Sequence, residues 1–347
     1  MWLINTQNLK LEELVDPSSL KYAILSHTWG NDEVSFQDIS NLELAKQKAG
    51  FWKIAKTCEL ARQRGIEYAW VDTCCIDKSS SAELSEAINS MFAWYKLSAV
   101  CFVFLSDLPP LDELTRLRNS GSKFFYDQEV FGKCRWFTRG WTLQELIAPD
   151  HVEFYNSEWE TFAQKSDCTL ILAEITGISH LVLESSSNLH QAPVAVKMSW
   201  AARRETKRIE DRAYSLLGIF DINMPMIYGE GHKAFRRLQE EIAKETNDLS
   251  LFAWRAPENK EPQEEQKQFF RGIFADSPLN FGTCSEIHKS RASLEDQREF
   301  SVTNKGVRIE TKVHQDSYGG YFVYLGFFKR DNTPVCINLV RTVNGFK

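Results

Sequence analysis

The chain has 347 residues, of which 43% are hydrophobic and 25% are charged, and its formal net charge is −6. This length exceeds what one small core needs and predicts at least two domains. The balance of apolar and charged residues is that of an ordinary folded protein. The negative net charge gives no reason to expect nucleic-acid binding.

The sequence also limits the compartment. Its eight cysteines show no zinc-type paired spacing, and several lie in strand-like apolar runs, as free thiols do in a reducing compartment. The N-terminus lacks a signal-peptide pattern, and no apolar run approaches the roughly 20 residues that span a bilayer. We therefore expect a cytoplasmic protein without a membrane span. Because the chain stops just after a strand-like run, we also expect it to be a fragment of a longer protein.

Strand and helix patterns alternate along the first 160 residues. A strand is expected at 21–29, a helix at 49–65 that ends at Gly65, a second strand at 66–77 and a second helix at 80–98 with Ser80 as its cap. The later elements are a strand at 99–107, a helix that begins at Trp141 and a strand at 151–157. This order predicts right-handed crossovers and an α/β fold with a mostly parallel sheet covered by helices on both faces.

Two long segments complete the organisation. A polar stretch at 108–132 lacks periodicity, and we interpret it as a loop that serves as a lid. Residues 161–255 have helical patterns, whereas 256–347 begin with a charged loop and continue as alternating strands, with a hairpin turn at 330–334. We therefore expect three parts: an α/β core at 1–160, a helical extension at 161–255 and a small, truncated β-rich region at 256–347.

Polar residues cluster where the predicted strands end. The first strand ends at Ser26, His27 and Trp29, the second at Asp72, and the third at Ser106. Ligands of open parallel sheets bind at this edge, where the strand order reverses. We therefore expect these side chains to line one crevice.

Glu145 is the candidate catalytic residue at that crevice. Trp141 and Glu145 are spaced i, i+4 and share one helix face, so the carboxylate would lie beside an indole in a partly desolvated setting, which can raise a carboxyl pKa. The alternative is a solvated carboxylate on an ordinary helix.

Plain structural roles compete with function at other positions. His27 can brace the strand end, Asp77 can cap a loop, and Cys74 and Cys75 are more typical of packing than of a nucleophile. The amides of Gly229 and Gly231 can hold an anion before a helix, although a plain helix start explains them as well.

Four long motifs resemble the fungal heterokaryon-incompatibility (HET) domain. They are YAILSHTWG, YAWVDTCCIDKSSSAELSEAINSMFAWY, CRWFTRGWTLQELIAP and AYSLLGIFDINMPMIYGEG, and the resemblance runs from about Tyr22 to Trp254. It implies a cell-death effector of fungal non-self recognition and innate immunity, often placed at the N-terminus of a larger receptor-type protein.

A more distant resemblance links WTLQEL to Toll/interleukin-1 receptor (TIR) domains, which have flavodoxin-like sheets and often cleave NAD. It implies that Glu145 is the catalytic glutamate and that Trp141 is the motif tryptophan, although Thr142 stands where the plant TIR motif has cysteine. The implied activity is that of an NAD glycohydrolase, with NAD as substrate, no cofactor, no metal and self-association for activity.

Ser26, His27, Trp29, Asp72, Ser106 and Trp141 would then bind the substrate. Two rival functions are a non-catalytic signalling module that oligomerises and recruits death partners, and a metal-dependent hydrolase that uses Asp72, Asp77 and Glu145.

Overall fold

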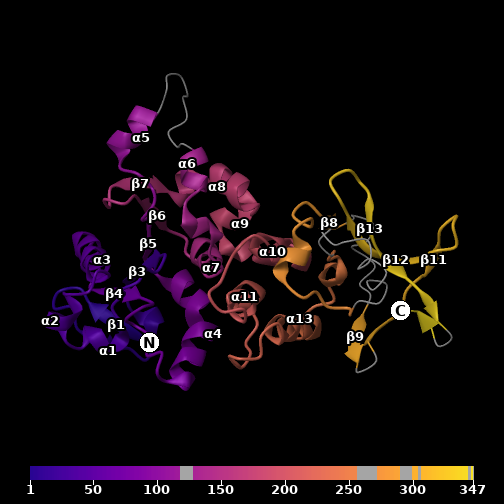
Figure 1. Cartoon of the computed structure of the whole chain (residues 1–347), viewed down its shortest axis with the longest axis horizontal. Coiled ribbons are helices and arrows are strands. Elements are labelled where there is room, and N and C mark those ends of the chain that lie inside the picture. Colours follow the sequence, from indigo (N-terminus) through magenta and orange to yellow (C-terminus); the bar gives the residue numbers. More distant parts are fainter. Residues whose placement is uncertain (118–127, 256–271, 290–298, 304–305, 343–344, 347) are drawn as a thin grey trace. The chain divides into compact units, whose positions relative to one another are not determined.

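The computed structural model describes residues 1–117, 128–255, 272–289, 299–303, 306–342 and 345–346 (Figure 1). The chain forms two compact units, Met1–Asn188 and Leu189–Lys347. The helical segment expected at 161–255 is distributed over both units. The three-part organisation stays a prediction.

The first unit is built on a seven-stranded sheet with the order β2-β1-β4-β3-β5-β6-β7. The strands are β1 (Trp2–Asn5), β2 (Leu11–Glu13), β3 (Tyr22–His27), β4 (Tyr68–Val71), β5 (Val100–Phe104), β6 (Val152–Tyr155) and β7 (Thr161–Gln164). The four central strands are parallel, whereas β1, β2 and β7 pair antiparallel at the two sides.

The parallel strands β4-β3-β5-β6 have the order 2-1-3-4 in sequence, as in flavodoxin-like sheets, and the order reverses between β3 and β5. The central strands β3 and β5 are buried at every position, which explains their near-continuous apolar sequences. The predicted α/β class with a mostly parallel sheet is confirmed.

Helices cover this sheet on both faces. Helix α3 (Phe51–Gln63) packs on β3 and β4, and Figure 1 shows it on one side of the strands, with α4 (Ser81–Leu97) and α7 (Thr142–Ile147) on the other. Ser80 caps α4 as predicted, since its side chain accepts a hydrogen bond from the Glu83 amide. The remaining helices of this unit are α1 (Phe36–Ile39), α2 (Leu42–Ala45), α5 (Leu111–Leu117), α6 (Gln128–Gly132), α8 (Thr169–Thr176) and α9 (His180–Glu184), together with the 3-10 helices η1 (Pro17–Ser19), η2 (Arg135–Thr138) and η3 (Lys165–Asp167).

The segment 108–132 is not the continuous loop that its sequence suggested. Helices α5 and α6 form its two ends, and residues 118–127 lie outside the described part of the chain. The lid interpretation falls mainly on those residues and stays a prediction.

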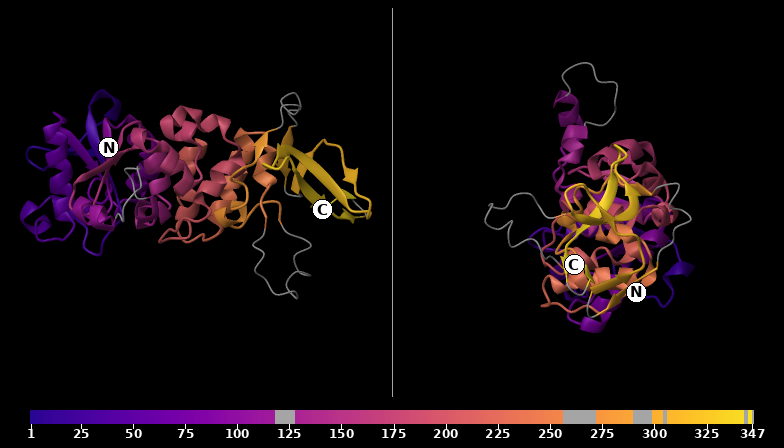
Figure 2. Two further views of the ribbon diagram at one scale, coloured as in Figure 1. Left: turned by 90° about the horizontal axis from the view of Figure 1, so that it is seen from above. Right: turned by 90° about the vertical axis from the view of Figure 1, so that its right-hand side faces the viewer.

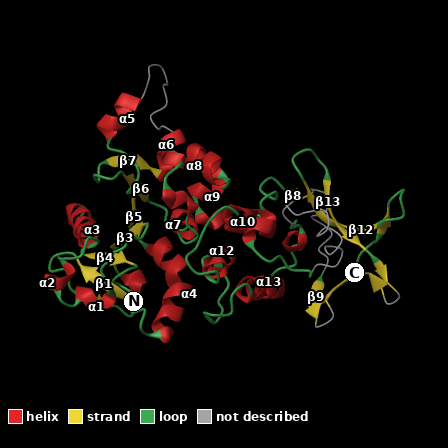
Figure 3. Ribbon diagram, in the orientation of Figure 1, coloured by secondary structure: helices red, strands yellow, loops and turns green. Residues whose placement is uncertain are grey.

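The second unit begins with helices and continues with strands (Figure 3). Its helices are α10 (Val194–Ala201), α11 (Asp211–Tyr214), α12 (Leu217–Phe220) and α13 (Lys233–Glu245), with the 3-10 helices η4 (Ser186–Gln191, which starts before the boundary), η5 (Leu249–Phe252) and η7 (Pro278–Phe281). Its strands are β8 (His288–Lys289), β9 (Phe300–Thr303), β10 (Gly306–Ile309), β11 (His314–Gln315), β12 (Tyr321–Phe328), β13 (Pro334–Leu339), β14 (Arg341–Thr342) and β15 (Gly345–Phe346).

The β-rich region is organised by the hairpin β12–β13, whose long antiparallel strands are yellow in Figure 2. Its turn lies at the predicted place, where Asn332 adopts the left-handed conformation with φ of 61° and its amide donates to the Lys329 carbonyl. The charged loop expected at 257–268 lies outside the described residues. In the part of the chain that the structure describes, no helix combines the length and apolarity needed to cross a membrane.

Candidate functional site

The end of strand β3 separates two polar clusters. Ser26 and His27 are consecutive in β3, so their side chains project to opposite faces of the sheet. Ser26 meets the face covered by α7, whereas His27 meets the face covered by α3. Both lie at the carboxyl edge of the sheet beside β5, where the strand order reverses.

The first cluster surrounds Glu145. The Ser26 hydroxyl donates a hydrogen bond to Glu145 Oε2 and accepts one from Trp136 Nε1 at 2.7 Å. Ser26 and Trp136 are fully buried, and Glu145 is 6% exposed. Burial, followed by the charge of Glu145, raises the pKa of the Tyr95 phenol well above its usual value. The solvated-carboxylate alternative for Glu145 is therefore wrong, but the carboxylate is also covered in this structure rather than open to a crevice.

Helix α7 is held at both ends. Thr142 Oγ1 donates to the carbonyls of Trp136 at 2.6 Å and Arg139 at 2.9 Å. At the other end, the buried Lys165 Nζ donates to the carbonyls of Leu146 and Pro149. A cation is favourable at a helix C-terminus, where carbonyls lack partners within the helix. These contacts fix the short segment that carries Glu145.

The second cluster surrounds His27. His27 Nδ1 lies 2.9 Å from Lys53 Nζ, and His27 Nε2 lies 3.2 Å from Asp72 Oδ1. The other Asp72 oxygen accepts a hydrogen bond from Trp29 Nε1 at 2.8 Å. Lys53 also pairs with Glu33. His27 therefore does brace the strand end, as its structural alternative predicted, and it also contacts a carboxylate that is partly open to solvent.

Asp72 is the most accessible acidic group of the second cluster, with 20% of its side chain exposed. Burial alone would raise the pKa of Asp72, but the hydrogen bonds from His27 and the Trp29 indole, together with the charge of Lys78, hold it below its usual value. Lys78 Nζ lies over the Trp29 ring, 4.0 Å from its centroid. This carboxylate is therefore poised as an ionised acceptor beside an indole that is 39% exposed.

The predicted site residues divide as follows. Ser26 and Glu145 form one cluster, and His27, Trp29 and Asp72 form the other. Ser106 is exposed after β5 and Trp141 is half-buried before α7. Within the described residues, neither of these two side chains hydrogen bonds to the clusters.

Sequence reasoning missed the residues that connect the clusters to the scaffold, namely Trp136, Tyr95 and Lys53. Trp136 lies in the CRWFTRGW motif, where its aromatic neighbours suggested a purely apolar role. In the structure its indole N–H donates a hydrogen bond to Ser26. Lys53 lies between apolar helix positions and is only 7% exposed. A lysine is rarely buried to this extent unless its charge has a partner. A lysine flanked by core positions of an amphipathic helix was the available signal.

The competing candidates have structural explanations. Asp77 accepts hydrogen bonds from the amide and hydroxyl of Ser79, which is loop capping. Cys74 and Cys75 are buried and contact Val71, and burial raises the pKa of the Cys74 thiol well above its usual value, which disfavours a nucleophile. Over the described residues, no group of three or more histidines, cysteines and acidic residues is arranged to hold a metal ion.

The amides of Gly229 and Gly231 do hold an anion, but the chain supplies it. Both donate to Glu210 Oε1, at 2.8 and 3.0 Å, just before α13 begins. Backbone hydrogen bonds hold the pKa of this buried carboxyl below its usual value, against the effect of burial. This arrangement explains the GEG motif as an internal carboxylate site.

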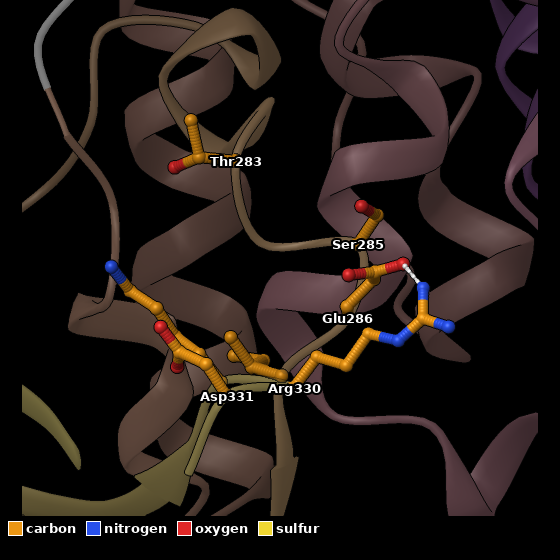
Figure 4. Close-up of a pocket in the computed structure, with 7 residues that line it drawn as sticks. Thr283, Ser285, Glu286, Arg330 and Asp331 are labelled. Atoms are coloured by element: carbon orange, nitrogen blue, oxygen red, sulfur yellow. Dashed lines mark hydrogen bonds and ion pairs between the residues drawn. The ribbon is translucent and has the colours of Figure 1, made fainter. Parts of the chain in front are cut away.

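Two cavities lie away from both clusters. One of about 420 Å³ in the second unit is lined by Thr283, Ser285, Glu286, Ile287, Lys329, Arg330 and Asp331, and Figure 4 shows the Glu286–Arg330 ion pair at its side. The other, of about 250 Å³, lies where β5 and β6 begin and includes Arg64 and His151 among its lining residues. Neither contains a predicted site residue.

Comparisons with known proteins agree with the motifs. Residues 22–145 match the family model of the heterokaryon incompatibility protein (HET), and residues 233–315 match a domain of unknown function (DUF8212). Over 232 residues, 66% of the chain, the sequence is 46% identical to vegetative incompatibility protein HET-E-1 of Podospora anserina. The chain spans 16% of the length of that relative.

No solved structure matches the chain, so the similarity to TIR domains stays a prediction. The matched residues 22–145 include both polar clusters and end at Glu145. Through this segment the chain belongs to the heterokaryon incompatibility (HET) domain family.

Proposed function

We propose that this chain is the cell-death effector part of a fungal heterokaryon incompatibility protein and that it acts by NAD glycohydrolysis. The first statement is supported by the HET match and by the identity to a vegetative incompatibility protein. The second is supported chiefly by one observation: Glu145 lies against the end of β3, at the reversal of strand order where α/β folds bind nucleotides.

The reaction would break the bond between nicotinamide and ribose. Nicotinamide leaves with the bonding electrons and becomes neutral, while positive charge builds on the ribose ring, as in glycoside hydrolysis. Water then forms the new bond to the ribose and releases a proton. The role of Glu145 is to stabilise that charge, since a carboxylate in a desolvated setting interacts strongly with a cation.

The second cluster supplies substrate contacts in this proposal. Asp72 accepts hydrogen bonds from ribose hydroxyls, and the exposed Trp29 indole stacks on a ring of the nucleotide. His27 orients Asp72. Ser106, which is exposed after the end of β5, and Trp141, which is half-buried before the start of α7, border the nucleotide.

The covered state of Glu145 makes a further demand. With 6% of the residue exposed, the carboxylate has no room for a substrate in this conformation. Activity therefore requires that α7 and the end of β3 separate, and we expect self-association of the chain to drive this change.

The test is release of nicotinamide from NAD by the purified chain over a range of protein concentrations. We expect Glu145→Gln to lower the rate at least about 100-fold with the fold intact, the scale at which removal of one charge-stabilising group acts. Glu158→Gln is a matched control, because Glu158 is exposed on the loop after β6. A Glu145→Gln variant that consumes NAD at the parental rate would overturn the assignment.

The non-catalytic signalling module is the second candidate. It is favoured by the burial of Glu145. The contacts of this carboxylate with Ser26 and Tyr95 hold α7 against the sheet, which is a structural role. In that case the chain would recruit death partners without releasing nicotinamide, even in its self-associated form. Toxicity that persists in Glu145→Gln would favour this function, and activity that persists in EDTA would exclude the metal-dependent hydrolase.

A further inference from the structure

Four charged and polar side chains contact one another in a row that runs from the loop after β3, through helix α3, to the edge of the sheet. Glu33 contacts Lys53, Lys53 contacts His27, and His27 contacts Asp72. The side chains of His27, Lys53 and Glu33 are 2%, 8% and 13% exposed. Asp72, the last member, is the most exposed of the four, with 20% of its side chain accessible to solvent.

The directions of the hydrogen bonds determine the state of the His27 ring. A lysine ammonium only donates, so Nδ1 must carry a lone pair where Lys53 approaches it. The proton of the neutral ring is then on Nε2, and Nε2 donates to Asp72 Oδ1. Glu33 supports this arrangement, because its carboxylate only accepts and so also takes Lys53 as the donor.

The loop after β3 is shaped to keep Glu33 in place. Glu33 Oε1 also accepts from the Gly30 amide at 2.6 Å, and the Gly50 amide donates to the Asp32 carbonyl at 2.8 Å. A Cβ added at Gly50 would lie 2.5 Å from Glu33 Oε2 and 2.9 Å from its Cα. Only glycine at this position lets the loop approach the start of α3 so closely.

We propose that Lys53 and Glu33 are positioning residues that lock His27 as the Nε2–H tautomer, so that Asp72 remains a hydrogen-bond acceptor for ligand hydroxyl groups. His27 donates to one oxygen of Asp72 and Trp29 donates to the other. Each oxygen keeps a further lone pair, so the carboxylate can still accept hydrogen bonds from a ligand. A pair of neighbouring sugar hydroxyls has the matching chemistry. The assignment of those hydroxyls to the ribose of NAD rests on the proposed function, whereas the tautomer lock does not.

The lock is tested by the ¹⁵N chemical shifts of the His27 ring in the full chain, assigned by comparison with His27→Gln. We expect the signature of a protonated Nε2 and an unprotonated Nδ1. Lys53→Met should convert this to a mixture of ring forms, and Lys53→Arg, which still offers a donor, should preserve it. Lys56→Met is the matched control, because Lys56 lies one turn away in α3 and pairs with Glu59 instead.

A protonated Nδ1 in the parent, or an unchanged ring in a folded Lys53→Met variant, would overturn the lock. If Lys53→Met fails to fold, Lys53→Gln replaces it, since a side-chain amide can either donate to Nδ1 or accept from it and so no longer fixes the tautomer.

The ligand part is tested by NAD cleavage. Lys53→Met should raise KM about tenfold with kcat changed less than twofold, because Asp72 would lose its oriented donor, and Lys53→Arg should restore KM. An unchanged KM beside an altered ring signal would overturn the ligand role alone. Absence of NAD cleavage in the parent would instead overturn the proposed function, while the ring signals would still decide the tautomer lock.

Discussion

Ser26 and Glu145 lie 119 residues apart in sequence, and the hydroxyl of the first donates a hydrogen bond to the carboxylate of the second. The contact joins the central strand β3 to the helix α7. Because both residues are buried, the free energy of unfolding should depend on this pair, which lies at the carboxyl edge of the sheet.

Ser26→Ala should lower the free energy of unfolding by about 1–3 kcal/mol, since it removes two buried hydrogen bonds, the one to the Glu145 carboxylate and the one from the Trp136 indole. Urea unfolding followed by tryptophan fluorescence measures the change. Ser106→Ala is the control: Ser106 is an exposed serine after the neighbouring strand, and its replacement should change stability by less than about 0.5 kcal/mol. Equal effects of the two substitutions would contradict the buried hydrogen bond.

Lys165 should make a stability contribution that depends on pH. Burial lowers the pKa of Lys165 to about 8, so the folded state gives up this proton before the unfolded state does. Between pH 8 and the ordinary lysine pKa the unfolded state holds more protons, and the contribution to stability rises as the pH rises through this window.

The measurement compares the parent with Lys165→Met in urea at pH 7.5 and pH 9. The difference in unfolding free energy between the two proteins should shift in favour of the parent by about 1 kcal/mol over this range. A difference that is constant with pH, or that shifts the other way, would show that Lys165 titrates normally in the folded protein.

Glu210→Ala should destabilise the second unit by about 1–3 kcal/mol, because the amides of Gly229 and Gly231 lose their buried acceptor at the start of α13. Glu210→Gln should cost less, since its carbonyl oxygen still accepts. Thermal unfolding followed by circular dichroism measures both, with the exposed Glu205→Ala as control. If Ala and Gln at position 210 cost the same, the amide hydrogen bonds do not hold this helix start.

The sequence predicted best those elements that are buried along their whole length or begin at a clear cap. Strands β3 and β5 are buried at every position and read as apolar runs, and α4 begins at its serine cap. The antiparallel strands β1, β2 and β7 were missed, because short strands with mixed burial have no clear alternation. Helices α5 and α6 were missed because they contain only seven and five residues, too few to establish a helical period in a polar segment.

The sequence predicted where the candidate site residues lie, but it did not predict which of them contact one another. Ser26, His27 and Asp72 follow from the rule that ligands bind at the carboxyl edge of a parallel sheet. They divide into two clusters because consecutive side chains of β3 point to opposite faces of the sheet. The prediction of a single crevice did not take this alternation into account. Lys53 and Trp136 reach the site from other segments, so their roles depend on tertiary contacts that no local pattern reports.

The two margins of the sheet limit how copies of the protein can meet. Both outermost strands, β2 and β7, run antiparallel to their neighbours and contain three and four residues. Such brief borders offer little backbone for pairing with a second molecule, and β2 also carries the exposed Glu13, which would repel the same border of another copy. Assemblies of this domain should therefore be joined through helices and loops, and they should not grow as continuous intermolecular sheets.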